Sequence, residues 1–212
     1  MTESHRNIDL ERFAAATLEQ DPFDHVVVPN FIAADAFADI VAAFPTIDQG
    51  GSFPLASVMF APVFGDFVAE LQGARVAQAF SEKFGTDLAG RLTMVTLRGQ
   101  SRKKDGRIHS DSKSKLITAL IYLNLDWTHV GGRLRLLRGL DNLDDYAKEI
   151  VPLAGTLVAF RCTENAYHGY RQFVGPRASL QLNWVTDKSV LSREFLRHGV
   201  SVKLKKWTGL GR

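Results

Sequence analysis

This sequence of 212 residues has a single cysteine, and we find in it neither a long apolar run nor the pattern expected of an apolar leader. Cys162 is the only cysteine, so no internal disulfide can form, and a reducing compartment is indicated. The longest apolar stretches, such as residues 116–125 and 151–160, are too short to cross a bilayer. Charged side chains near Met1 leave no room for a signal-peptide core. We therefore predict a cytoplasmic protein with no membrane partner.

The first 187 residues also lack an excess of positive charge. The formal net charge of the chain is +3, yet residues 188–212 alone hold seven Lys and Arg against the single acid Glu194. A basic tail can bind anionic partners, but such a run is more often a solvated face. We interpret it as solvated, and nothing in the sequence indicates an oligomeric state.

The hydrophobic pattern changes from helical to strand-like near residue 90. Before that point, apolar residues recur at helical spacing in segments 33–44, 63–71 and 76–84. From Leu92 the period becomes two, and short runs are separated by Gly, Asp and Asn turn signals without helical crossovers. The expected strands are 92–98, 115–124, 133–137, 156–161, 178–186 and 200–204.

This order predicts a mainly β fold with N-terminal helices. Short strands without helical crossovers are typical of an antiparallel barrel or sandwich, such as the jelly-roll or cupin-like architecture. Residues 1–90 would form a helical buttress on one outer face, and residues 91–212 would form the core and a C-terminal strand. Because the chain has no repeat, low-complexity stretch or linker, we expect a single domain over residues 1–212.

Three residues are candidates for binding a metal ion. His109 and Asp111 are two residues apart, so on an extended chain both side chains point to the same side. This pair alone is weak evidence, since it often arises by chance. His168 follows the expected strand 156–161. Two histidines and one carboxylate leave three positions open on an ion, an arrangement favoured by non-haem iron(II) oxygenases, in which a bidentate oxo-acid and dioxygen can bind.

The strand expected after His168 has one polar and one apolar face. Alternation along residues 177–184 puts Arg177, Ser179, Gln181 and Asn183 on one face, and Ala178, Leu180, Leu182 and Trp184 on the other. Burying the polar set is costly unless it binds something. A planar guanidinium suits a carboxylate held bidentately, and a hydroxyl two residues further on can add a hydrogen bond. This face predicts a site for a dicarboxylate whose other end reaches the metal.

Seven motifs between Leu92 and Thr186 occur in an order that is more specific than any one of them. They are His109-x-Asp111, Ile121-Tyr-Leu-Asn124, Asp126-Trp127, Gly131-Gly132, Pro152-x-x-Gly155, His168 and Arg177-x-Ser179. With these motifs the chain resembles the 2-oxoglutarate/iron(II)-dependent dioxygenase superfamily, in its prolyl-4-hydroxylase-like branch. The resemblance implies a double-stranded β-helix core that holds iron on His109, Asp111 and His168.

The resemblance also implies the co-substrates and their binding residues. Arg177 would bind the distal carboxylate of 2-oxoglutarate, helped by Ser179 and Tyr122. Dioxygen would take the remaining metal position, and oxidative decarboxylation would release succinate and carbon dioxide as the substrate is hydroxylated. Arg98 stands where some relatives carry a tyrosine that points into the pocket, and Asn183 stands where hypoxia-sensing prolyl hydroxylases often carry tryptophan. A prolyl substrate is therefore not implied.

Three other function classes fit part of this pattern. A zinc hydrolase could use His, Asp and His, but it would not need Arg177. A non-catalytic metal- or sugar-binding cupin-like protein would keep the fold, and only succinate release separates it from an enzyme. A nucleic-acid demethylase of the same superfamily carries a second arginine six residues after the first, where this chain has Asn183. We therefore do not expect a nucleic-acid partner.

The segment 98–107 leads directly into His109 and holds five basic residues against Asp105. Loops at the mouth of a rigid scaffold often carry recognition, and clustered positive charge can steer an anion. We expect a small-molecule or peptide substrate with an anionic group, contacted by Arg98 or Arg102. The alternative is a solvated basic loop, with Arg98 contacting 2-oxoglutarate instead.

Overall fold

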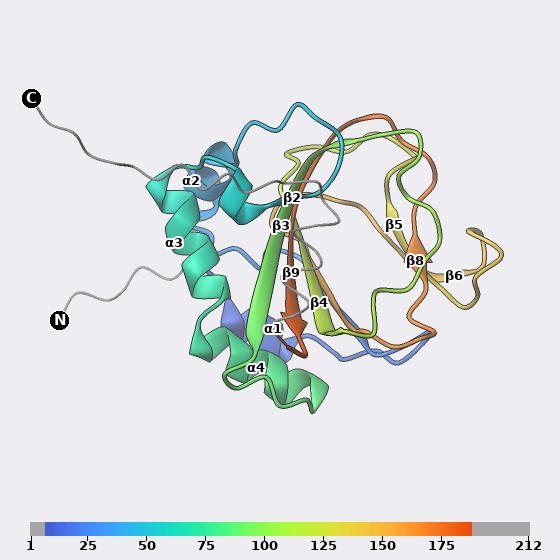
Figure 1. Cartoon of the computed structure of the whole chain (residues 1–212), viewed down its shortest axis with the longest axis horizontal. Helices are drawn as coiled ribbons and strands as arrows, with labels where there is room; N and C mark the ends of the chain where they lie inside the picture. The colour runs from blue at the N-terminus through green and yellow to red at the C-terminus, as the bar shows by residue number, and fades with distance from the viewer. Residues whose placement is uncertain (1–6, 188–212) are drawn as a thin grey trace, which may run out of the picture.

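Two antiparallel β-sheets and a layer of helices make up the computed structural model, which describes residues 7–187. The helices cover one face of the larger sheet, and the smaller sheet lies on its other side (Figure 1). The helices are α1 (Leu10–Ala15), α2 (Phe37–Ala42), the 3-10 helix η1 (Leu55–Ser57), α3 (Pro62–Leu71) and α4 (Ala74–Phe84). The strands are β1 (His25–Val28), β2 (Phe53–Pro54), β3 (Leu92–Ser101), β4 (Lys115–Tyr122), β5 (Leu134–Leu137), β6 (Tyr146–Ile150), β7 (Leu157–Arg161), β8 (His168–Gly169) and β9 (Gly175–Val185).

Most strands that are neighbours in a sheet are not consecutive in the chain. The larger sheet has the order β1-β7-β4-β9-β3-β2, and the smaller sheet has the order β6-β5-β8. Every named pair is antiparallel. The mainly β fold with N-terminal helices that the sequence predicts is thereby confirmed. Among residues 7–187, no helix has the length and apolar character needed to cross a membrane.

The central strand β9 shows why this sequence forms two layers. Its residues Leu180, Leu182 and Trp184 alternate with polar residues and are buried in the cluster that the helices cover. The Trp184 ring lies 4.8 Å, centroid to centroid, from the ring of Phe80 on α4. Burying each such side chain contributes about 1.5–3 kcal/mol to folding. The apolar face of β9 is therefore bound to the helices, which leaves its polar face toward the smaller sheet.

Several boundaries differ from the sequence prediction. The first 90 residues are not wholly helical, because β1 and β2 belong to the larger sheet. In β1, Val26 and Val28 join the helix-covered cluster while His25 pairs with Phe160 of β7. Strands β6 and β8 were not expected, and α2 is shorter than the apolar segment 33–44. The expected strand 200–204 and the basic tail lie outside the described residues.

Candidate functional site

A cavity of about 310 Å³ lies between the two sheets. Its walls come from β3, β4 and β9 of the larger sheet, from β5 and β8 of the smaller one, and from the loop before His109. Six of the seven site residues proposed from the sequence line it, namely Arg98, His109, Asp111, His168, Arg177 and Ser179. The seventh, Tyr122, is fully buried and lies behind Arg177.

Backbone pairing brings the two histidines together. His109 and His168 form an isolated antiparallel bridge, in which each backbone N–H donates to the carbonyl of the other at 3.1 and 2.9 Å. Their ring centroids are 4.3 Å apart. The Nδ1 atoms lie 2.9 Å from the Arg107 carbonyl and 3.0 Å from the Ala166 carbonyl. If each Nδ1–H donates to its carbonyl, both Nε2 atoms are left free to bind a metal.

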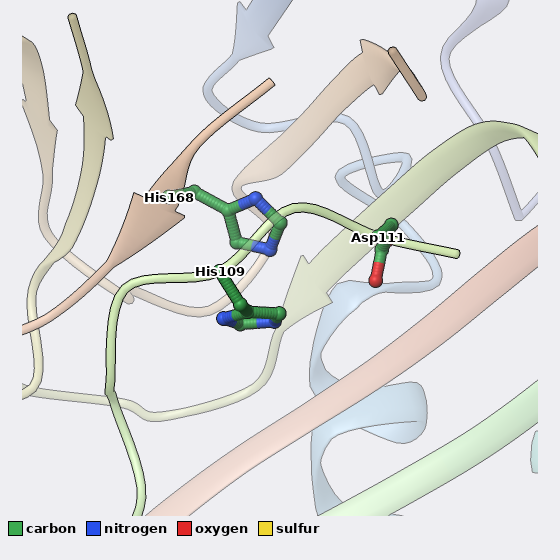
Figure 2. A group of neighbouring side chains, drawn as sticks. All are labelled: His109, Asp111 and His168. Atoms are coloured by element: carbon green, nitrogen blue, oxygen red, sulfur yellow. The ribbon is translucent and has the colours of Figure 1, made fainter. Parts of the chain in front are cut away.

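Asp111 completes a group of three possible ligands, and Figure 2 shows its side chain beside the two imidazoles. One ligand atom from each of His109, Asp111 and His168 lies within 4.8 Å of the other two. Ligand atoms about 2 Å from one ion lie at most about 4 Å apart, so small side-chain rotations suffice to bring all three onto the same ion. The donor set is the two-histidine, one-carboxylate set of non-haem iron(II) sites.

The surroundings favour the protonation states that bind a metal. Burial alone would raise the pKa of Asp111, but Lys115, His168 and Thr118 outweigh it and lower the pKa to about 2. Burial lowers the pKa of His168 to about 4, although the Asp111 carboxylate opposes it. At neutral pH the carboxylate is therefore ionised and the His168 imidazole is neutral, as metal ligation requires.

Two residues that sequence reasoning did not assign hold the Asp111 carboxylate in place. Lys115 Nζ lies 3.1 Å from Oδ1, and the Thr118 hydroxyl donates to Oδ2. Asn183 Nδ2 in turn donates to the Thr118 Oγ1 at 2.7 Å. The sequence could have indicated Thr118, because alternation along β4 places it on the same face as Tyr122. No sequence pattern predicts the contact of Lys115 with Asp111, since this contact depends on how the loop after Asp111 turns.

Arg177 is buried, with 4% of its surface exposed, at the other side of the cavity. Its Nε donates to the Gly132 carbonyl at 2.8 Å, and its Nη2 lies 3.4 Å from the Tyr122 hydroxyl. The guanidinium also lies over the ring of Tyr170, 4.3 Å from its centroid. Among residues 7–187, no carboxylate forms an ion pair with it. A buried cation without an anion is costly, so the site favours an anionic ligand.

Burial also determines the state of Tyr122. It raises the pKa of the phenol despite the nearby Arg177 guanidinium. The hydroxyl is therefore protonated at neutral pH and can donate a hydrogen bond. Gly132 helps to place the guanidinium, since its φ of +77° and a Cβ position only 2.5 Å from the Trp127 ring leave no room for a larger residue.

The two arginines offered as substrate contacts lie in different places. Arg98 lines the cavity and donates to Asp105 at 2.8 Å and to Ser52 at 3.1 Å. Arg102 packs against Gly50 and bonds Asp105, and it does not line the cavity. The structure thus brings Arg98, and not Arg102, to the candidate site.

Comparison with known proteins finds a family model that resembles part of the chain. The family model of the 2OG-Fe(II) oxygenase superfamily matches residues 97–185, which include all seven site residues proposed from the sequence. This segment of the chain is similar to that superfamily. A search of curated proteins found no significant match.

Solved structures confirm the oxygenase fold. A prolyl-4-hydroxylase from Pseudomonas putida superposes with a TM-score of 0.54 at 19% identity, over 87% of this chain and 100% of that one. A Phytophthora capsici prolyl 4-hydroxylase gives 0.52 at 18%, over 92% and 75%. HygX from Streptomyces hygroscopicus, solved with nickel and 2-oxoglutarate bound, gives 0.51 at 13%, over 76% and 81%. These superpositions support the jelly-roll core, and identities this low say nothing about the substrate of this protein.

Proposed function

We propose that this oxygenase hydroxylates a small molecule or peptide, with 2-oxoglutarate and dioxygen as co-substrates and with succinate and carbon dioxide as by-products. In this proposal His109, Asp111 and His168 hold iron(II). Arg177 binds the distal carboxylate of 2-oxoglutarate, and Ser179 and Tyr122 donate hydrogen bonds to it. Arg98 is a further candidate for this carboxylate or for the substrate.

One observation carries the proposal, namely that a buried, anion-free guanidinium shares a cavity with three converging metal ligands. The Arg177 guanidinium and the His109, Asp111 and His168 side chains line the same space of about 310 Å³. A dicarboxylate that chelates an ion with one end and reaches an arginine with the other uses both features at once. A zinc hydrolase or a metal-storage protein would need the three ligands but not the guanidinium.

The chemistry divides between the metal and the chain. When bound, iron(II) supplies the activation of dioxygen and the oxidative decarboxylation of 2-oxoglutarate. The chain orients the co-substrate, since Gly132 and the aromatic rings limit where the Arg177 guanidinium can move. Lys115 and Thr118 hold the Asp111 carboxylate in one orientation. The two sheets shield the carboxylate-binding end from water, where a charge-assisted hydrogen bond is strongest.

The decisive experiment follows succinate formation by protein supplied with iron(II), 2-oxoglutarate and air, together with a metabolite and peptide extract. We expect succinate and a product heavier by one oxygen atom, both of which are lost in Asp111→Ala. Asp126→Ala, which alters an exposed carboxylate outside the cavity, is the matched control and should behave as wild type. Folded, metal-loaded protein that forms no succinate would instead indicate the non-catalytic cupin-like alternative.

A further inference from the structure

Two cations at the cavity remain without a role in the proposed function. Lys104 and Arg107 line the same cavity as the metal ligands, and both residues are exposed to solvent. Within the described part of the chain, neither side chain forms an ion pair or a side-chain hydrogen bond. This distinguishes them from Arg98, which is neutralised by Asp105.

The loop that carries these cations is anchored. The Asp105 carboxylate accepts from the Arg102 backbone N–H at 2.9 Å, and the Gly106 carbonyl accepts from the Tyr170 N–H at 2.9 Å. Gly106 has a φ of +86°, and a Cβ there would lie 2.6 Å from the Tyr170 ring, so the loop sits directly on the strand that carries His168. The backbone positions of Lys104 and Arg107 at the rim are therefore set by the fold.

The charges at the cavity do not balance, even with both cofactors bound. Its lining holds four basic side chains, Arg98, Lys104, Arg107 and Arg177, against the carboxylates of Asp105 and Asp111. Iron(II) and the 2-oxoglutarate dianion add equal and opposite charges. The lining therefore keeps an excess of two positive charges, and Lys104 and Arg107 are its exposed cations. Exposed cations at a cleft raise the local concentration of anions.

We propose that the substrate is a small anionic molecule whose carboxylate or phosphate group is bound by Lys104 and Arg107. This inference rests on the proposed function, because it assumes that Arg177 and the metal are occupied by 2-oxoglutarate. The cavity of about 310 Å³ lies at the lower end of the range of ligand cavities, about 300–1,000 Å³, and it must also hold 2-oxoglutarate, so a substrate that enters it has to be small. Arg107 and His109 line the same cavity and are two residues apart, so an anion bound by the Arg107 side chain would lie beside the metal centre.

The test uses manganese(II)-loaded full-length protein saturated with N-oxalylglycine, a 2-oxoglutarate isostere. Methyl phosphate is titrated in, and its phosphorus relaxation reports binding near the paramagnetic ion. Acetate, followed by proton relaxation, is the carboxylate arm of the same experiment. We expect saturable binding of one or both anions, weakened about ten- to hundredfold in the double variant Lys104→Gln/Arg107→Gln, because two charge-assisted contacts are lost. Lys103→Gln changes an exposed neighbour that does not line the cavity, and it should bind like wild type.

Each outcome separates the two proposals. Wild-type protein that binds N-oxalylglycine but neither anion overturns the anionic-substrate inference and leaves the proposed function standing. The inference also fails if the double variant binds as wild type does, or if Lys103→Gln weakens binding equally. Anion binding that disappears when N-oxalylglycine is added assigns the anion to the Arg177 site and overturns it as well. Failure to bind N-oxalylglycine in a metal-dependent way counts against both proposals.

Discussion

The two faces of β9 are equally buried and chemically opposite. Leu180, Leu182 and Trp184 on one face are at most 1% exposed, and Arg177 and Ser179 on the other are each 4% exposed. The apolar face packs on the helix-covered cluster, whereas the polar face lines the cavity. Burial alone therefore does not separate core from site. The useful distinction is whether a buried polar group has found its partner within the chain.

The polar residues of β9 differ in whether they have such a partner within the chain. Asn183 is satisfied, because it donates to Thr118 and accepts from Gln181. Arg177 is hydrogen-bonded to neutral groups only and has no counter-ion among residues 7–187. We infer that the apolar face stabilises the fold, while Arg177 lowers stability in exchange for ligand binding, a common trade-off at functional sites.

The largest effect on stability should come from the apolar face. Trp184→Ala removes a buried ring that packs on Phe80, and we expect it to lower the free energy of unfolding by about 3–5 kcal/mol, measured by urea denaturation. Trp127→Ala, which truncates a partly exposed tryptophan in a loop, is the matched control and should cost clearly less. Similar losses in the two variants would mean that the Phe80–Trp184 contact does not stabilise the core.

The polar face should show the reverse behaviour. Arg177→Met removes the proposed partner of the distal carboxylate, a loss worth about 2–5 kcal/mol of 2-oxoglutarate binding. The free energy of unfolding should not fall, because an uncompensated buried charge is removed at the same time. Calorimetric titration of 2-oxoglutarate and urea denaturation measure the two quantities. Arg138→Met, at an exposed ion pair, controls for loss of an arginine. Unchanged 2-oxoglutarate affinity in Arg177→Met would place the carboxylate elsewhere.

A smaller effect is expected at the hydroxyl that links the polar face to the metal ligands. Thr118→Val keeps the shape but removes the donor to Asp111 and the acceptor for Asn183. Removing a residue that orients a metal ligand typically lowers metal affinity about 10–100-fold. Manganese(II) titration of the metal-free protein measures this loss. Thr128→Val, at an exposed position, should bind manganese as wild type does, and a wild-type affinity in Thr118→Val would show that Asp111 needs no such support.

The smallest effect tests a buried polar group outside the cavity. His25 on β1 is fully buried, with Nδ1 2.8 Å from the Phe23 carbonyl and Nε2 3.6 Å from Glu19. Burial lowers the pKa of His25 below its usual value, although the Phe23 carbonyl and Glu19 oppose it. The unfolded chain therefore binds a proton at a higher pH than the folded chain does. As the pH falls below about 6.5, His25 should lower wild-type stability by less than about 1.4 kcal/mol per pH unit.

His25→Gln should make this decline shallower, since glutamine does not titrate, while His168, whose pKa burial lowers to about 4, still contributes to it. Urea denaturation between pH 7 and pH 5 provides the measurement, and His129→Gln, at an exposed histidine, provides the control. If wild type and His25→Gln lose stability in parallel over this range, burial of His25 has no influence on the acid response.

Much of the core was predictable because alternation is a local signal. The faces of β9 and of β4 follow from side-chain period alone. In the structure Arg177 and Ser179 line the cavity, and the Tyr122 hydroxyl contacts Arg177. Strands β3, β4, β5, β7 and β9 coincide with expected segments within a few residues. The roles of the site residues stay predictions, to be tested as described above.

What the sequence did not reveal depends on contacts between distant segments. Strand β8 has only two residues, His168 and Gly169, and is defined by their pairing with β5. A run this short has no periodic pattern that could predict it. Strand β1 is a four-residue run that pairs with β7, more than a hundred residues later. The exclusion of Arg102 from the cavity likewise depends on a turn held by Asp105. Such features are set by tertiary structure, which propensity cannot supply.

The central claim is that one dicarboxylate binds to the metal ligands and to the polar face of β9 together. Anaerobic calorimetric titration of 2-oxoglutarate, with and without iron(II), into wild type, Asp111→Ala and Arg177→Met tests it most directly. We expect iron(II) to tighten wild-type binding, Asp111→Ala to lose this dependence on iron, and Arg177→Met to weaken binding whether or not iron is present. Wild-type binding that ignores iron, or variants that bind 2-oxoglutarate as wild type does, would contradict the account.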